Sequence, residues 1–318
     1  MKENTYFKSD LFHFESGVNN LLNKNSPQKK LAKEHIEKYL ENYISIKNYN
    51  KKNSEFSTYF DLCKRILTDS ISDKAIQKKF FNNLEKLSNS EISNSLNKKP
   101  DQQSLTGIYG RNWPKHAHTM IGLMRLENLQ FCVEETIRNN IRGDLIETGV
   151  WRGGATIFMK IILKKYGIEN KIVYVADSFE GLPKPNVDKF SEDKGSDLYT
   201  YDELKIGFEE VQRNFKMYNV LDDQVKFIKG FFEDTMKNTN IEKLSLLRLD
   251  GDMYGSTWSV LENLYENLSI GGFLIVDDYH IGSCRKAIQD FRELNKIKEP
   301  IMSIDGNGVF WKKEYNPN

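Results

Sequence analysis

Acidic residues stand at the points where the sequence predicts several buried strands to end. Glu147, Asp177, Asp250 and the pair Asp277 and Asp278 each follow a short apolar run. Ligands of open α/β sheets bind beyond the carboxyl ends of the strands, so these carboxylates are candidates for one site. Asp250, Asp277 and Asp278 would repel one another unless a cation neutralised them, and all-oxygen ligands suit a hard ion such as Mg²⁺.

A glycine-bearing turn follows the first of these strands and precedes a helical run. Gly149, Gly153 and Gly154 let the chain turn sharply, but their spacing differs from the G-x-G-x-x-G pattern that binds a pyrophosphate. The carboxylate of Glu147 would repel phosphates and attract a ribose hydroxyl or an ammonium group. The turn therefore favours S-adenosylmethionine over a dinucleotide, and Asp177, thirty positions after Glu147, is placed to hold the two ribose hydroxyls.

The elements that position these residues are strands and helices in alternation. Strands are expected over 145–148, 172–176, 225–229, 244–249 and 273–276, and helices over 156–166, 203–218, 256–268 and 284–294. Such alternation predicts an α/β fold with a doubly wound, mostly parallel sheet. Two further apolar runs, 301–304 and 308–311, are separated by the turn residues 305–307 and predict an antiparallel hairpin at the edge of the sheet.

The first hundred residues differ in character from the rest. Apolar residues recur at helical spacing over 31–46, 56–67 and 76–87, and residues 88–103 are polar, low in complexity and typical of a linker. We therefore expect a helical N-terminal extension over residues 1–103 and a second domain over 104–318. The pattern is compatible with a helical cap, an oligomerisation surface or a partner-binding module.

Two loops and one histidine are candidates for substrate contact. Residues 109–118 combine Tyr, Trp, Arg and His in a glycine-bearing loop, which offers stacking surface and hydrogen bonds, although Trp113 could instead pin the loop to the domain. The polar segment 183–202 is longer than a usual βα connection, as lids and binding elements are. His280 follows the aspartate pair and is open to a substrate role or to a plain surface role.

Composition sets the limits on other functions. A chain of 318 residues suffices for one full domain and a smaller one. The net charge of +1 gives no electrostatic argument for nucleic acid or an anionic membrane. The sequence shows no signal peptide pattern and no run of about 18 apolar residues. Its three cysteines lack metal-type spacing. We therefore expect a soluble, cytoplasmic protein without a nucleic-acid or membrane partner.

Four segments resemble the macrocin O-methyltransferase family. They are residues 145–154, 175–183, 247–254 and 271–279, and the resemblance runs from about residue 106 to residue 311. Members of this family methylate deoxysugar hydroxyls of macrolide and aminocoumarin antibiotics and use S-adenosylmethionine and Mg²⁺. The resemblance implies a Rossmann-like class I methyltransferase fold, a small-molecule or glycoside acceptor and a homo-oligomer. The first hundred residues are an extension beyond it.

The resemblance also implies roles for individual residues. Glu147 and Gly149 would face the methionine part of the cofactor, Asp177 would hold the ribose, Ser178 and Phe232 would flank the adenine, and Asp250, Asp277 and Asp278 would bind the metal. Asp250 would also lie against the cofactor and serve as the catalytic general base. Met120, before the core domain, falls where related enzymes close over the cofactor.

Three alternatives to a sugar O-methyltransferase remain open on the sequence. A catechol-type phenolic O-methyltransferase uses a similar fold and metal site. A dinucleotide-dependent oxidoreductase shares the alternating architecture but requires the standard glycine fingerprint and no acidic triad. A non-catalytic scaffold with a methyltransferase fold would bind the cofactor without turning over an acceptor.

Overall fold

The computed structural model describes residues 29–70, 114 and 116–316 of the chain. The chain divides into two compact units. One comprises residues 1–128 with 303–307, and the other comprises residues 129–302 with 308–318. The second unit carries the strands and helices that follow the glycine turn and therefore holds nearly all the residues of the predicted site.

Seven strands form one sheet in the order β3-β2-β1-β4-β5-β7-β6. They are β1 (Asp144–Thr148), β2 (Val173–Asp177), β3 (Val225–Lys229), β4 (Leu244–Leu249), β5 (Leu268–Val276), β6 (Met302–Ser303) and β7 (Val309–Lys312). β1 to β5 pair in parallel, and β7 pairs with β5 in the antiparallel direction. The sheet confirms the expected doubly wound fold with antiparallel strands at its C-terminal edge.

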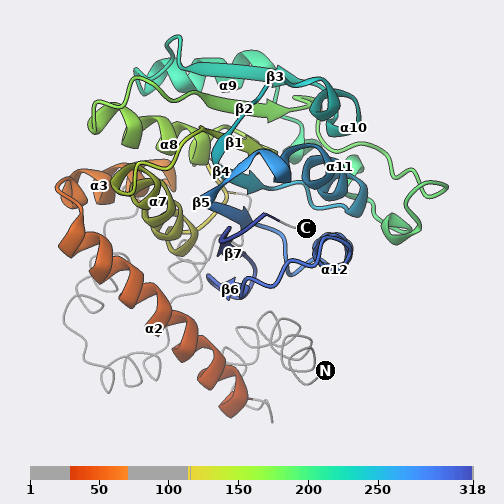
Figure 1. The fold of residues 1–318 in the computed structure, drawn as a ribbon, viewed down its shortest axis with the longest axis horizontal. Helices are drawn as coiled ribbons and strands as arrows, with labels where there is room; N and C mark the ends of the chain where they lie inside the picture. Colours follow the sequence, from red (N-terminus) through yellow and green to blue (C-terminus); the bar gives the residue numbers. More distant parts are fainter. Residues whose placement is uncertain (1–28, 71–113, 115, 317–318) are drawn as a thin grey trace. The chain divides into compact units, whose positions relative to one another are not determined.

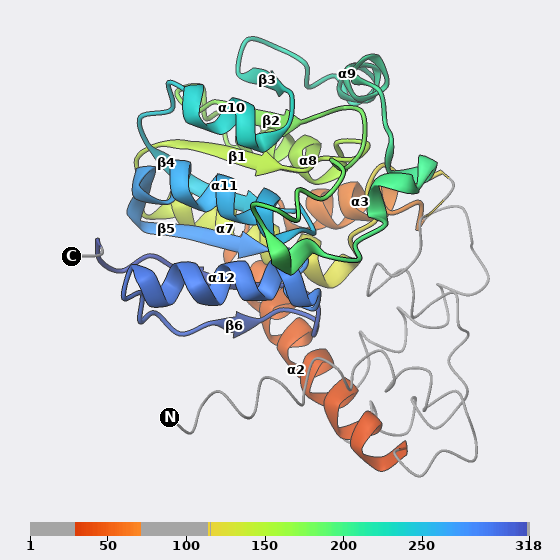
Figure 2. The ribbon, with the colours of Figure 1, turned by 90° about the vertical axis from the view of Figure 1, so that its right-hand side faces the viewer.

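Helices cover both faces of the sheet, which explains why its central strands β1 and β4 are almost wholly buried. α8 (Gly154–Lys165) and α9 (Phe208–Met217) lie on one face, and α10 (Phe232–Thr235), α11 (Tyr254–Leu264) and α12 (Gly282–Leu294) lie on the other (Figures 1 and 2). β4 is buried along its whole length. On the first face, the ring of Phe227 in β3 lies 5.1 Å from that of Phe208 and 5.7 Å from that of Phe215 in α9.

Register brings the ends of the central strands to one edge. Glu147 of β1 is opposite Val175 of β2 on one side and Arg248 of β4 on the other, and Arg248 is opposite Ile275 of β5. Figure 2 shows the arrowheads of β1 and β5 pointing to the same side. The residues that follow β1, β2, β4 and β5 therefore meet at a single edge of the sheet.

Two expected helices were too long. The helix expected over 256–268 ends at Leu264, and β5 already begins at Leu268. Gly271 and Gly272 lie inside this strand. A Cβ at Gly272 would come within 2.8 Å of the carbonyl oxygen of Ser245, so this position of the strand requires glycine. The helix expected over 203–218 begins only at Phe208, after a short 3₁₀ turn and Gly207.

The first unit contains α2 (Lys29–Asn53), α3 (Ser57–Leu67) and the beginning of α7 (Leu123–Arg138). Lys64 of α3 forms a buried ion pair with Glu127 of α7, and Asn50 of α2 donates a hydrogen bond of 2.8 Å to the same carboxylate. α2 and α3 confirm two of the three expected helices. The third, over 76–87, and the linker over 88–103 lie outside the described residues, so the boundary at residue 103 stays a prediction.

Candidate functional site

The turn after β1 approaches the end of β4 at very short range. Gly149 has φ +90°, and a Cβ there would lie 1.7 Å from the carbonyl oxygen of Asp250. Only glycine fits this position, both for the backbone angle and for the space. Trp151, two residues later, has φ +47°, which is uncommon for a bulky residue and marks a turn held by its surroundings.

Asp177 ends β2 and holds the glycine turn in place. Its Oδ2 accepts a hydrogen bond of 2.7 Å from the backbone N–H of Val150, and its Oδ1 accepts one of 2.8 Å from that of Phe179. Burial raises the pKa of Asp177, and these N–H groups oppose that rise. The backbone N–H of Trp151 and the side chain of Ser178 also favour the ionised carboxylate, and the expected contact of Asp177 with a ribose stays a prediction.

Ser178 and Phe232, the residues expected beside an adenine, follow the end of β2 and begin α10. The Ser178 hydroxyl donates 2.6 Å to the carbonyl oxygen of Gly181, so this side chain closes its own turn. The ring of Phe232, at the start of α10, lies 3.4 Å from the point where a Cβ on Gly251 would stand. Phe232 is thus brought to the end of β4, and its role toward an adenine stays a prediction.

A buried arginine that the sequence analysis did not single out joins the carboxylates. Arg248 donates from Nη1 to Glu147 and, at 2.7 Å, to Asp250, and from Nη2 to Asp277. Its side chain is 1% exposed. Burial alone would lower the pKa of Arg248, but Asp277, Asp250 and Glu147 raise it well above its usual range. The sequence did contain one sign of this role, because Arg248 is a charged residue inside the mainly apolar strand β4.

Three aspartates are arranged as a metal site would require. One carboxylate oxygen from each of Asp250, Asp277 and Asp278 lies within 4.8 Å of the others. Burial, reinforced by nearby carboxylates, raises the pKa of Asp278 well above its usual value and also raises that of Asp250. Burial is the largest cause of both shifts, and the three carboxylate oxygens form a donor set of the kind that a hard divalent cation prefers.

Glu147 is 2% exposed and already bonded at both oxygens. Its Oε1 accepts from Arg248, and its Oε2 accepts from the Thr156 hydroxyl in α8. Burial raises the pKa of Glu147 to about 7, with Arg248 opposing the rise. The structure thus brings Glu147 to the same edge as the aspartates, and the expected contact with the cofactor stays a prediction.

Asp252 is a second acid without an assigned role in the sequence analysis. It lies two residues beyond Asp250, is half-buried, and has φ +58°. Its backbone N–H donates 3.2 Å to Oδ2 of Asp278. Burial, with smaller effects from Asp250 and Asp277, raises the pKa of Asp252 to about 7. Such a carboxyl group is suited to accept a proton near neutral pH.

Other candidates are not joined to this site by the structure. Met120 belongs to the first unit, and most of the loop 109–118 lies outside the described residues. His280 is half-buried just after the aspartate pair. The expected substrate and cofactor roles of these residues stay predictions.

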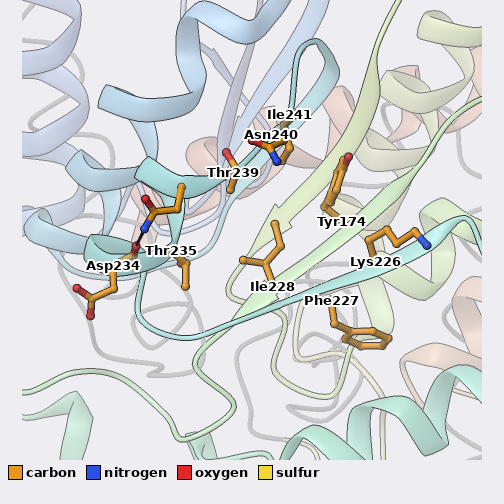
Figure 3. A pocket seen from close by; sticks show the side chains of 10 residues that line it. Tyr174, Lys226, Phe227, Ile228, Asp234, Thr235, Thr239, Asn240 and Ile241 are labelled. Carbon is orange, nitrogen blue, oxygen red and sulfur yellow. Dashed lines mark hydrogen bonds between the residues drawn. The ribbon is translucent and has the colours of Figure 1, made fainter.

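A pocket of about 430 Å³ lies elsewhere on the sheet (Figure 3). It is lined by Tyr174 of β2, Lys226 and Ile228 of β3, and residues 234–235 and 238–241 of the following segment, with Phe227 at its border. None of the predicted site residues lines it. In Figure 3 the ring of Phe227 points away from Tyr174, in line with the alternation of a strand.

In the described residues, no helix is long and apolar enough to cross a membrane.

Comparisons with known proteins show the family to which the chain belongs. The sequence profile described as Macrocin-O-methyltransferase (TylF) matches residues 56–313 and so includes α3, which the sequence analysis placed in the extension. The Streptomyces olivaceus 8-demethyl-8-(2,3-dimethoxy-alpha-L-rhamnosyl)-tetracenomycin-C 4'-O-methyltransferase is 44% identical over 256 residues, which cover 80% of this chain and 92% of the relative.

Two further proteins extend the likeness. Mycinamicin III 3''-O-methyltransferase of Micromonospora griseorubida is 48% identical over 207 residues, which cover 64% of this chain and 82% of the relative. The solved structure of the O-methyltransferase NovP is 39% identical with a TM-score of 0.71, and the match covers 82% of this chain and 100% of NovP. From the profile, the relatives and the shared fold, the chain belongs to the macrocin O-methyltransferase family and is an O-methyltransferase.

Proposed function

We propose that the protein methylates a hydroxyl group of a sugar, in a natural product or a glycan, with S-adenosylmethionine as methyl donor and Mg²⁺ as cofactor. The single observation that carries the proposal is the edge of the sheet where Asp177 ends β2 and the cluster of Asp250, Asp277 and Asp278 follows β4 and β5. An edge of this kind can hold a ribose by its hydroxyls and a hard cation a short distance away. Relatives named for sugar acceptors support the same substrate class.

Positioning is the first task of the residues at this edge. S-adenosylmethionine supplies an electrophilic methyl group, and transfer requires the acceptor oxygen about 3 Å from it and opposite the leaving sulfur. Asp177 and the glycine turn would fix the donor, because Asp177 already holds the turn through the backbone N–H of Val150. The new C–O bond forms as the C–S bond breaks, and the sulfur keeps the electron pair of the C–S bond.

Removal of the acceptor proton is the second task. A sugar hydroxyl is a poor nucleophile at neutral pH, and a divalent cation held by Asp250, Asp277 and Asp278 would lower its pKa. The proton then passes to a carboxylate, for which Asp250 is our first candidate. Asp252 is a second candidate, because Asp250 already accepts a bond from Arg248 whereas the pKa of Asp252 is about 7.

Calorimetry and an acceptor panel test the proposal together. S-adenosylhomocysteine is titrated into the chelator-treated protein with and without added Mg²⁺, and methyl transfer is then measured on mycinamicin III, a rhamnosyl tetracenomycin and catechol. We expect binding of S-adenosylhomocysteine in the micromolar range, weakened in Asp177→Ala, and Mg²⁺-dependent transfer to a glycoside. Preference for catechol would favour the phenolic alternative. Binding without transfer to any acceptor would favour the scaffold, and absence of binding would overturn the proposal.

A further inference from the structure

Asp193 lies in the long loop after β2, residues 183–202. It joins this loop to α11, the helix that follows the segment carrying Asp250 and Asp252. Its side chain is 2% exposed, although it belongs to a loop. Oδ1 accepts a hydrogen bond of 2.7 Å from the backbone N–H of Tyr254, and Oδ2 accepts one of 2.9 Å from that of Gly255. These are the first two residues of α11, whose N–H groups have no partner within the helix. The carboxylate therefore caps α11 and meets the positive end of its dipole.

The same part of the loop has a shape match with α11. The ring of Phe190 is 8% exposed and lies 5.7 Å from the ring of Tyr254. A Cβ at Gly255 would come within 2.5 Å of Cδ2 of Phe190. The loop can rest on the first turn of α11 only because residue 255 has no side chain.

A second anchor ties Glu203, which directly follows the loop of residues 183–202, to the glycine turn. Nε1 of Trp151 donates a hydrogen bond of 2.8 Å to the carbonyl oxygen of Glu203. The guanidinium of Arg152 lies over the indole ring of Trp151, 4.2 Å from its centre. The loop is thus held on two sides of the carboxylate edge, at α11 beyond Asp252 and at the turn beyond β1. In Figure 2 it lies at the side to which the strand arrowheads point.

We propose that Asp193 is a positioning residue for the acceptor, because it holds the loop of residues 183–202 against the helix that follows Asp250 and Asp252. This inference rests on the proposed function. Asp193 and Phe190 are both buried at this junction. By capping α11, Asp193 also fixes the start of the helix that follows the segment carrying Asp250 and Asp252.

Two variants disturb this junction from opposite sides. Asp193→Asn keeps the shape but removes the charge and one acceptor oxygen. Gly255→Ala keeps the Asp193 carboxylate and favours the helix, but its methyl group would stand 2.5 Å from Cδ2 of Phe190 and 3.3 Å from Oδ2 of Asp193, so the loop must shift. Asp144→Asn is the matched control for the first variant, because Oδ1 of Asp144 accepts a backbone bond of 2.8 Å from Ile172 at the opposite end of β1. Gly282→Ala is the control for the second, because a Cβ there has nothing within 4 Å.

Hydrogen exchange, S-adenosylhomocysteine affinity and kinetics are measured on the full chain. For both variants we expect amides of 183–202 and 254–258 to exchange about tenfold faster, since either one hydrogen bond and the charge of the cap or one contact surface is lost. kcat/KM for mycinamicin III should fall about tenfold, whereas the KM for S-adenosylmethionine and the affinity for S-adenosylhomocysteine change by less than about twofold. Both controls should behave as the unchanged protein does.

The possible failures are distinct. If hydrogen exchange of residues 183–202 is unchanged in Asp193→Asn, the inference is overturned and the proposed function is left intact. An equal loss of kcat/KM for acceptor and donor has the same two consequences. If the unchanged protein does not methylate mycinamicin III, exchange and S-adenosylhomocysteine affinity alone decide the inference. An unchanged protein that does not bind S-adenosylhomocysteine overturns the proposed function, and the inference falls with it.

Discussion

At the scale of the residue, variants of Asp250 and Asp252, the two aspartates that follow β4, are expected to distinguish metal binding from proton transfer. Asp250→Asn should remove a metal ligand and lower kcat by about 100-fold or more, because both activation and orientation of the acceptor weaken. The affinity for S-adenosylhomocysteine should change little. The measurement is steady-state kinetics over a range of Mg²⁺ concentrations, with calorimetry for the cofactor product.

Asp252→Asn is the matched comparison. If Asp252 accepts the proton, this variant loses kcat at every Mg²⁺ concentration, whereas the loss in Asp250→Asn is accompanied by a weaker apparent affinity for Mg²⁺. Full activity of Asp250→Asn in the presence of Mg²⁺ would contradict both of its assigned roles.

Arg248 should be needed for stability more than any single acid that it binds. Arg248→Met leaves Glu147, Asp250 and Asp277 without their shared cation, and removal of one partner of a buried ion pair costs about 3–5 kcal/mol. Arg248→Lys should restore only part of this, because one ammonium group cannot reach three carboxylates in the planar geometry of a guanidinium. Urea unfolding of the chelator-treated protein measures the difference. A loss of less than about 1 kcal/mol in Arg248→Met would show that the network is not built around this side chain.

The acids could be predicted from the sequence, and Arg248 could not. An acid that follows a short apolar run marks the end of a strand, and strand ends of a parallel sheet share an edge. The partners of Arg248 come from three strands, and they meet only through the register that sets Glu147 opposite Arg248 and Arg248 opposite Ile275. A single strand, Leu244–Leu249, gives no information on that register.

At the scale of the element, the glycine turn should tolerate no side chain at Gly149. Gly149→Ala combines a positive φ with a methyl group 1.7 Å from the Asp250 carbonyl oxygen, so the ends of β1 and β4 must move apart. We expect a loss of about 2–5 kcal/mol in the free energy of unfolding. Gly167→Ala is the control, because Gly167 also has a positive φ, +65°, but open space around its Cβ. Equal losses in the two variants, measured by urea unfolding, would show that strain and not close approach sets the requirement.

Element boundaries were the part of the fold that the sequence predicted least well. The fifth strand was expected only over 273–276, but β5 also includes Gly271 and Gly272. Gly271 donates to the carbonyl oxygen of Lys313, and a Cβ at Gly272 would meet that of Ser245. Close approach between backbones explains these glycines. The relevant neighbour is distant in sequence, so local pattern could not reveal it.

At the scale of the whole molecule, the sequence predicted two parts but not where the family begins. The family profile starts at residue 56, so α3 belongs to the shared length although the sequence analysis placed it in the extension. The composition of a helix depends largely on its exposed residues, whereas its packing depends on the residues of its buried face. In α3 that face includes Phe60, Cys63, Lys64 and Leu67.

Removal of the predicted extension should therefore destabilise the first unit. A chain that begins at residue 104 lacks Lys64 and Asn50, which bind the carboxylate of Glu127. Glu127 is 2% exposed, and an uncompensated buried charge costs about 3–5 kcal/mol. We expect a lower midpoint of urea unfolding for the shortened chain. Lys64→Met in the full chain should reproduce part of this loss, and Glu127→Gln should reduce it in both backgrounds because a neutral amide needs no cation. If the shortened chain is as stable as the full chain and binds S-adenosylhomocysteine equally well, the boundary at residue 103 is a true domain boundary and α3 is dispensable.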